Sequence, residues 1–224
     1  EMGVDGWRLD VPFEIKDETF WQQFRSVTKA PNKDAYLVGE IPTEAQEWLK
    51  GDMFDGVMNY QFTAACVGFF GAGRRDDSLI SGMMGLLEVP EMDAPNFADR
   101  CKKLLELYPK QNALAQLNLL DSHDMPRFLS MVSGDVRAFR LATLFQMTYP
   151  GAPCIYYGDE IGIMGGRDPE NREPFPWDSS RWNHDLRNEF KKFIQIRKDN
   201  RVLRTGEFVL LYAKDRQMAF VRHL

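Results

Sequence analysis

The feature that most constrains the fold is an alternation of short apolar runs with longer stretches of helical period. The runs are rich in β-branched or aromatic residues, and Gly, Pro or Asp bound several of them. They occupy residues 4–9, 36–39, 56–59, 114–120 and 153–157. Such runs are typical of parallel strands buried on both faces. Strands that alternate with helices form βαβ units, so the sequence predicts an α/β fold with a parallel sheet.

Helical spacing predicts helices at 17–28, where Asp17 is the expected N-cap, and at 44–49, 135–147 and 185–197. The stretch 61–110 breaks the alternation, and we expect it to hold two or three helices and a loop at 89–95. Beyond residue 201 the pattern changes to short alternating runs at 208–212 and 218–221, separated by a turn at 214–216. We therefore predict one α/β domain over residues 1–202 and an antiparallel β module over 203–224.

Composition excludes several classes of protein. The chain carries 33 acidic and 28 basic side chains, a net charge of −5, with no basic block, so we expect no nucleic-acid partner. It has no apolar run of about 18–20 residues, so we expect no membrane span. Its three cysteines are odd in number and form no CxxC pair, and it has three histidines. We expect no metal and no cofactor. Free thiols favour a reducing compartment, so we predict a cytoplasmic protein.

Charged side chains stand where several predicted strands end. Arg8 and Asp10 lie on one face of the first strand because side chains alternate along a strand. Glu40 ends the second strand, and His123 and Asp124 follow the fourth. Functional groups of parallel α/β proteins gather at such ends. Acids placed beside Arg and His suit glycoside cleavage, which needs one ionised carboxylate and one protonated carboxyl.

The same strand ends carry specific motifs. The strings DGWRLD (5–10), VGE (38–40), NLLDSHD (118–124) and PGAPCIYYGDEIG (150–162) resemble conserved regions of the α-amylase family of glycoside hydrolases, in the family's order. WLKGDMFD (48–55), GGRDPENR (165–172) and FPW (175–177) are similar to its cyclomaltodextrinase, neopullulanase and maltogenic-amylase branch. The resemblance implies the C-terminal half of a TIM (β/α)8 barrel, strands 4 to 8, within residues 1–202. It also implies that 203–224 begin a C-terminal β-sandwich domain.

Carried over by position, the resemblance implies that Asp10 is the nucleophile, Glu40 the general acid and base, and Asp124 the stabiliser of the distorted sugar. Arg8 would orient Asp10 and keep it ionised. The family retains anomeric configuration, so we predict that the carboxyls of residues 10 and 40 lie about 5–5.5 Å apart.

Three further side chains are implied to bind substrate. His123 would donate a hydrogen bond to the same sugar as Asp124. Asp168 and Arg172 match positions that the branch uses to hold glucose units on the non-reducing side of the scissile bond. The alternative for Asp168 and Arg172 is a pair that stabilises its own loop.

The function implied is hydrolysis of α-1,4 glucosidic bonds in cyclomaltodextrins, pullulan or maltooligosaccharides through a covalent glycosyl-enzyme. The partner is thus an α-glucan oligosaccharide or cyclodextrin. Two alternatives stay open: a transglycosylase on the same substrates, and a non-catalytic α-glucan-binding homologue. The branch implies a homodimeric parent protein. Because half a barrel exposes apolar faces and strand edges, we expect the segment alone to be inactive or poorly folded.

The sequence departs from the branch at two places. Pro42 follows Glu40-Ile41 where the branch carries Trp, and Pro12-Phe13 replaces a small residue and Asn. Phe13 could supply the missing stacking surface on the leaving side.

Some further side chains have a structural interpretation. We expect the acids at 5, 121, 159 and 160 to be caps or strand-end partners of basic side chains, and the Trp side chains at 7, 21, 48 and 177 to be core or packing residues.

Overall fold

The computed structural model describes residues 3–82 and 89–224. Three strands form a parallel sheet in chain order: β1 (Gly6–Leu9), β2 (Tyr36–Gly39) and β3 (Gly56–Val57). Two more, β4 (Leu117–Leu119) and β5 (Ala152–Cys154), pair in parallel with each other.

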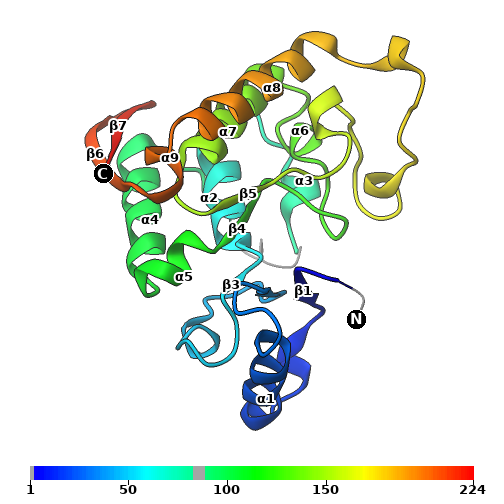
Figure 1. The fold of residues 1–224 in the computed structure, drawn as a ribbon. Coiled ribbons are helices and arrows are strands. Elements are labelled where there is room, and N and C mark those ends of the chain that lie inside the picture. Colours follow the sequence, from blue (N-terminus) through cyan, green and yellow to red (C-terminus); the bar gives the residue numbers. More distant parts are fainter. Residues whose placement is uncertain (1–2, 83–88) are drawn as a thin grey trace.

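A parallel bridge between Met58 and Leu117 joins the end of β3 to β4. The strands β1 to β5 therefore follow one another in chain order with the same direction (Figure 1). The predicted parallel α/β arrangement is confirmed, and all parallel strand ends face the same edge.

Four strands, β1, β3, β4 and β5, are shorter than predicted, and for β3 and β4 the reason is that neighbouring residues have other partners. The run at 114–120 begins inside α5 (Lys110–Leu114). The run at 56–59 ends early because the Asn59 side chain accepts a hydrogen bond from the backbone N–H of Phe62 and caps the next helix.

Three predicted helices are confirmed, each with a polar N-cap. They are α1 (Glu18–Lys29), α7 (Val136–Thr148) and α8 (His184–Asp199), capped by the side chains of Asp17, Asp135 and Asn183. The helix expected at 44–49 is wrong. Only a 3-10 turn, Gln46–Trp48, forms there. Ala45 at the N-cap position offers no capping side chain, and the segment is too short to offset the free-energy cost of helix nucleation.

The stretch 61–110 holds the expected helices, α2 (Tyr60–Phe70), α3 (Asp77–Ile80) and α4 (Ala94–Glu106). Its predicted loop stops at Asp93, whose side chain caps α4. The other short elements are α6 (Phe128–Met131), α9 (Val202–Thr205) and 3-10 turns at Pro12–Glu14, Asp159–Ile161, Glu170–Arg172 and Ser179–Arg181.

The last two strands, β6 (Glu207–Lys214) and β7 (Gln217–His223), form an antiparallel hairpin, as the alternating pattern predicts. Figure 1 shows this hairpin in red at the left, beside α4 and α9 and away from α1, which is blue and lies at the bottom. No helix in the described ranges combines the length and apolar character needed to cross a bilayer.

Two apolar cores lie on opposite faces of β2 and β3. Leu37 and Val57 belong to the smaller core beneath α1, whereas Val38 and Met58 belong to the larger one. Successive residues of a strand point to opposite faces, so both faces of these strands are buried. The smaller core contains Trp21, which is 4% exposed.

The Trp side chains do not all pack as expected. Trp48 stacks on Phe54 beside the smaller core, with ring centroids 5.5 Å apart. Trp7 and Trp177 are 41% and 82% exposed. Neither belongs to the core, because Trp7 lies on β1 at the edge of the sheet and Trp177 lies in the long segment before α8. Trp177 instead packs against Phe175, with ring centroids 4.9 Å apart.

Candidate active site

Parallel pairing places Asp10 and Glu40 next to each other. Leu9 of β1 is paired with Gly39 of β2, so Asp10 and Glu40 are each the first residue beyond the paired ends. The backbone N–H of Glu40 also donates to the carbonyl of Leu9 (2.9 Å). Regular strand geometry alone thus delivers both carboxyls to one edge of the sheet.

Arg8 connects these two acids. Its Nη1 donates to Asp10 and its Nη2 to Glu40, while its Nε points at the sulfur of Met58 (3.4 Å). The exposed fractions of the two carboxyl side chains differ sharply, at 77% for Asp10 and 2% for Glu40. One guanidinium therefore holds a solvent-facing carboxylate and a buried carboxyl in a common plane of donors.

Glu40 is held from two further sides. The backbone N–H of Val11 donates to its Oε2 (3.1 Å), and the hydroxyl of buried Tyr60 lies 3.4 Å from its Oε1. Val11 adopts a left-handed conformation (φ 31°), which is unfavourable for a β-branched residue. This backbone geometry aims the amide at Glu40 immediately after Asp10.

Burial raises the pKa of Glu40, and the negative charges of Asp124 and Asp10 add to this shift. The N–H of Val11 and the guanidinium of Arg8 oppose it without cancelling it. A carboxyl with a raised pKa keeps its proton at a pH where an ordinary carboxyl has lost it. Glu40 is therefore suited to donate a proton.

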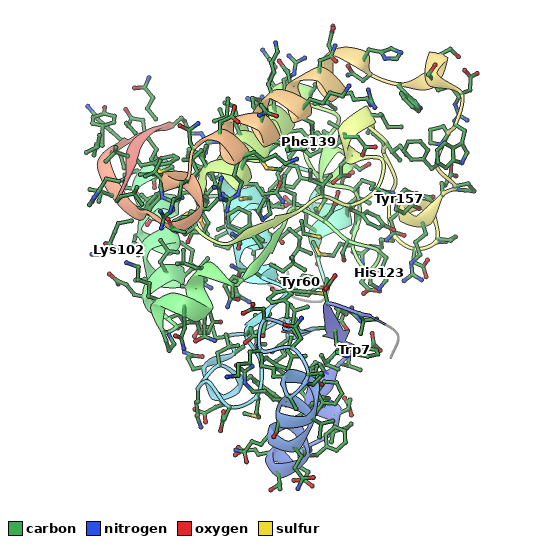
Figure 2. The ribbon with its side chains drawn as sticks, in the orientation of Figure 1. Trp7, Tyr60, Lys102, His123, Phe139 and Tyr157 are labelled. Carbon is green, nitrogen blue, oxygen red and sulfur yellow. The ribbon has the colours of Figure 1, made fainter. Side chains whose placement is uncertain are left out.

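Asp124 and His123 complete the cluster from the loop after β4. His123 Nε2 lies 2.9 Å from Asp124 Oδ2. One polar atom from each of Glu40, His123 and Asp124 lies within 4.8 Å of the other two. Figure 2 shows Tyr60 and His123 where the N-terminal segment meets the rest of the chain.

Arg172 extends the cluster toward Asp168. Its Nη2 lies 3.1 Å from Asp124 Oδ1, and its Nε donates to the carbonyl of His123 (2.7 Å) and lies 3.4 Å from Asp168 Oδ1. The structure thus brings all the predicted site residues into one cluster, in which hydrogen bonds or ion pairs link each residue to the next except where Glu40 lies within 4.8 Å of His123 and Asp124. In order, they are Asp10, Arg8, Glu40, His123, Asp124, Arg172 and Asp168.

The grouping of Glu40, His123 and Asp124 also resembles a set of metal ligands. Arg8, however, already donates to Glu40, and Arg172 pairs with Asp124. A cation at this position would lie between two fixed positive charges, so the donor set does not favour a metal.

The acids at 121, 159 and 160 have structural partners, as expected. Asp121 accepts from the N–H of Phe128 (2.6 Å), Asp159 pairs with Arg127 (3.3 Å), and Glu160 accepts from the N–H of Gly158 (2.9 Å).

Sequence reasoning missed several groups that shape the site. Tyr60 opens α2 and reads as core, the Val11 contribution is a backbone amide, and Asn171 donates to the carbonyls of His123 and Met125 from a buried position. None has a periodic or charge signal that would have singled it out. Phe13 is half-buried and packs against the smaller core.

Known proteins are similar to this chain. Residues 1–206 match the family described as "Alpha amylase, catalytic domain". A cyclomaltodextrinase of Geobacillus thermopakistaniensis (strain MAS1) is 46% identical over 215 residues, covering 96% of this chain and 34% of the relative. Neopullulanase 2 of Thermoactinomyces vulgaris is 45% identical over 197 residues, covering 88% of this chain and 31% of the relative.

A solved structure, the native form of the Nostoc punctiforme debranching enzyme, matches with a TM-score of 0.94 and 44% identity. The match covers 99% of this chain and 45% of that one. This chain spans 34% and 31% of the length of the two relatives named above. The resemblance read from the motifs is confirmed: the chain belongs to the α-amylase family of glycoside hydrolases.

Proposed function

We propose that the protein carrying this chain hydrolyses α-1,4 glucosidic bonds in cyclomaltodextrins, pullulan or maltooligosaccharides through a covalent glycosyl-enzyme. The observation that carries the proposal is the bridge from Arg8 to both Asp10 and Glu40. It joins an exposed carboxylate to a buried carboxyl with a raised pKa, which is the pairing that glycoside cleavage needs.

In the first step, the Asp10 carboxylate attacks the anomeric carbon while Glu40 gives its proton to the glycosidic oxygen. The bond to the leaving sugar breaks as the bond to Asp10 forms. In the second step, Glu40 takes a proton from water, the water oxygen attacks the anomeric carbon, and Asp10 is released.

The remaining side chains bind and orient the sugar. Arg8 orients Asp10 by donating a hydrogen bond to its carboxylate. Asp124 and His123 face the same space as Glu40 and would hold the hydroxyls of the distorted sugar. Arg172 and Asp168 continue outward from Asp124 and would hold glucosyl units on the non-reducing side.

The stereochemical outcome tests this proposal. Full-length protein is mixed with maltohexaose or a cyclodextrin, and proton NMR follows the first anomer formed. We expect the α-anomer, since both carboxyls accept from one guanidinium and we predict a separation of about 5–5.5 Å between them. First release of the β-anomer would contradict the covalent route, and absence of any cleavage would contradict the function. Products longer than the substrate would favour the transglycosylase alternative.

We also propose that β1 to β5 are strands 4 to 8 of a (β/α)8 barrel and that residues 203–224 begin a separate β domain. The in-order parallel pairing of β1 to β5 and the antiparallel β6–β7 hairpin support this assignment. The homodimeric parent protein and the cytoplasmic location remain predictions. If the barrel assignment holds, we expect the 224-residue chain on its own to be inactive. Hydrolysis of maltooligosaccharide or cyclodextrin by this chain at the rate of the full-length protein would refute that expectation.

A further inference from the structure

Arg127 is a fully buried side chain that the proposed chemistry does not use. Its guanidinium lies over the rings of Tyr156 and Tyr157, 3.9 Å and 4.6 Å from their centroids. Nη1 donates to the carbonyl of Tyr157 (2.6 Å) and lies 3.3 Å from Asp159 Oδ1. A buried cation is costly unless it is paired and hydrogen-bonded, so this environment is built around the guanidinium.

Arg127 also binds both ends of one tight turn, residues 165–171. Its backbone N–H donates to the carbonyl of Gly165 (3.0 Å), and its Nε donates to the carbonyl of Asn171 (3.0 Å). The two ends of the turn touch, because a Cβ at Gly165 would lie 2.4 Å from the carbonyl oxygen of Glu170. Asp168 lies in the middle of this turn.

The 165–171 turn also contacts the loop that carries Asp124. The Asn171 side chain donates to the carbonyls of His123 (2.7 Å) and Met125 (2.9 Å). Arg172, the next residue, reaches Asp124 and Asp168 with a side chain that is 44% exposed. Ion pairs this exposed hold a geometry only weakly. Arg172 also donates to the carbonyl of His123, which the buried Asn171 side chain holds as well, so the buried contacts beneath help to fix where Arg172 points.

We propose that Arg127 is a positioning residue that clamps the 165–171 turn against the loop of His123 and Asp124, and so sets the placement of Arg172 and Asp168 for glucosyl units on the non-reducing side. The inference rests on the proposed function, since it assigns this turn to substrate chain length. A lysine cannot replace Arg127 in this role, because an ammonium lacks the planar face that lies over the two tyrosine rings and the fork of donors that reaches the carbonyls of Tyr157 and Asn171.

The test compares two substrates in the full-length protein. Nitrophenyl α-glucoside offers one glucosyl unit, whereas nitrophenyl α-maltotrioside also reaches toward Arg172 and Asp168. We expect Arg127→Lys to lower the ratio of kcat/KM for the long over the short substrate by about tenfold, because misplacing a binding group by about 1 Å can cost about 100-fold. Arg172→Ala should lower the same ratio, and the loss in the double variant should be smaller than the product of the two single losses, because both changes act on the same turn.

Arg197→Lys is the matched control. Arg197 is another buried arginine that donates to backbone carbonyls, those of Met147, Tyr149, Gly151 and Leu203, in contacts that include none of the site residues. Its replacement loosens the fold but should leave the substrate ratio unchanged. An equal loss on both substrates in Arg127→Lys would show a general structural role and overturn the proposal, as would additive losses in the double variant.

Hydrogen exchange gives a readout that does not depend on activity. In Arg127→Lys we expect faster amide exchange in peptides covering 163–172 and unchanged exchange in peptides covering β1 and β2. Unchanged exchange at 163–172 overturns the clamp even if the wild-type protein cleaves no α-glucan. Conversely, an inactive wild-type protein with the expected exchange pattern would overturn the proposed function and leave the clamp standing.

Discussion

The two sides of the site are held in different ways. Asp10 and Glu40 are the first residues beyond paired strands, and one arginine from the same strand bridges them. Asp124 lies in the loop after β4, and its contacts come from His123 and Arg172.

This difference shows what each side needs from the rest of the molecule. On the side of Asp10 and Glu40, the strand side, the backbone hydrogen bonds between β1 and β2 position the reacting groups. On the side of Asp124, the loop side, strand pairing does not hold the residue, and hydrogen bonds from buried polar side chains such as Asn171 and Arg127 hold the loops in place. Substitutions on the strand side should therefore change the chemistry directly, whereas those beneath the loop should change how much of the substrate is held.

The largest effect is expected from Asp10→Asn in the full-length protein. The amide keeps the shape of the side chain but is a poor nucleophile, so kcat should fall by about 10⁴-fold or more. Initial rates on maltohexaose, with circular dichroism to confirm folding, measure this. A kcat within tenfold of the wild type would exclude Asp10 as the nucleophile.

Glu40→Gln should show a loss that depends on the leaving group. Without the proton donor, kcat/KM for cleavage between two sugars, which reports the first step alone, should fall by about 10²–10⁴-fold. Nitrophenyl α-maltotrioside should lose much less, because nitrophenolate leaves without protonation. Equal losses on the two substrates would exclude Glu40 as the general acid.

Asp124→Asn tests the electrostatic link between the two sides. Its negative charge is one cause of the raised pKa of Glu40, after burial. The other charged or titratable groups that face Glu40 are Arg8, Asp10, Tyr60 and His123. Removing a nearby negative charge lowers the pKa of a carboxyl. Because Glu40 must be protonated to act, the basic limb of kcat/KM should move to lower pH.

The pH–rate profile of the residual activity checks this shift. Asp168→Asn serves as the control, since Asp168 reaches the cluster only through Arg172 and should leave the basic limb in place. A basic limb that stays or rises in Asp124→Asn would show that the two sides are not coupled.

Asp55→Asn should affect stability rather than chemistry. Asp55 accepts from the N–H of Leu37 and pairs with Arg25 and Lys29, each at 2.9 Å, and so fastens α1 to the strand side. We expect the free energy of unfolding to fall by about 1.5–3 kcal/mol. Urea unfolding measures this change in the free energy of unfolding. Asp52→Asn, which removes an exposed carboxylate that accepts from the Gln22 side chain, is the control. Equal midpoints for the two variants would show that this anchor contributes little.

Phe13→Ala is expected to give the smallest effect. If Phe13 replaces the aromatic that Pro42 displaces, its loss should raise KM for long substrates by about two- to tenfold, the worth of one aromatic contact of about 0.5–1.5 kcal/mol. The packing of Phe13 against the smaller core limits the ring surface left for a sugar. An unchanged KM would remove Phe13 from the leaving side.

The sequence predicted the order and the direction of the parallel strands, because runs such as those of β2 and β3, which are mostly buried on both faces, appear as continuous apolar stretches. The predicted strand at 153–157 is too long for a reason that local pattern cannot reveal. Tyr156 and Tyr157 continue the apolar run, yet β5 ends at Cys154 and their rings lie against Arg127, which is distant in the chain.

The site residues likewise fall into those that local sequence pattern predicts and those that it does not. Asp10 and Glu40 stand at strand ends within motifs, so both pattern and resemblance single them out. Arg127, Asn171 and Tyr60 act through contacts between segments far apart in sequence, and a buried polar residue carries no periodic signal. Only the folded geometry identifies them.

The central claim is that Asp10 forms a covalent bond with the sugar while Glu40 serves it as acid and base. Full-length protein incubated with a slowly turned-over fluorinated maltosyl fluoride, then digested and sequenced by mass spectrometry, tests it most directly. The account predicts one added fluorinated maltosyl unit on the peptide that contains Asp10, at that carboxyl. A label on another residue, or release of fluoride with no labelled peptide at any time, would contradict it.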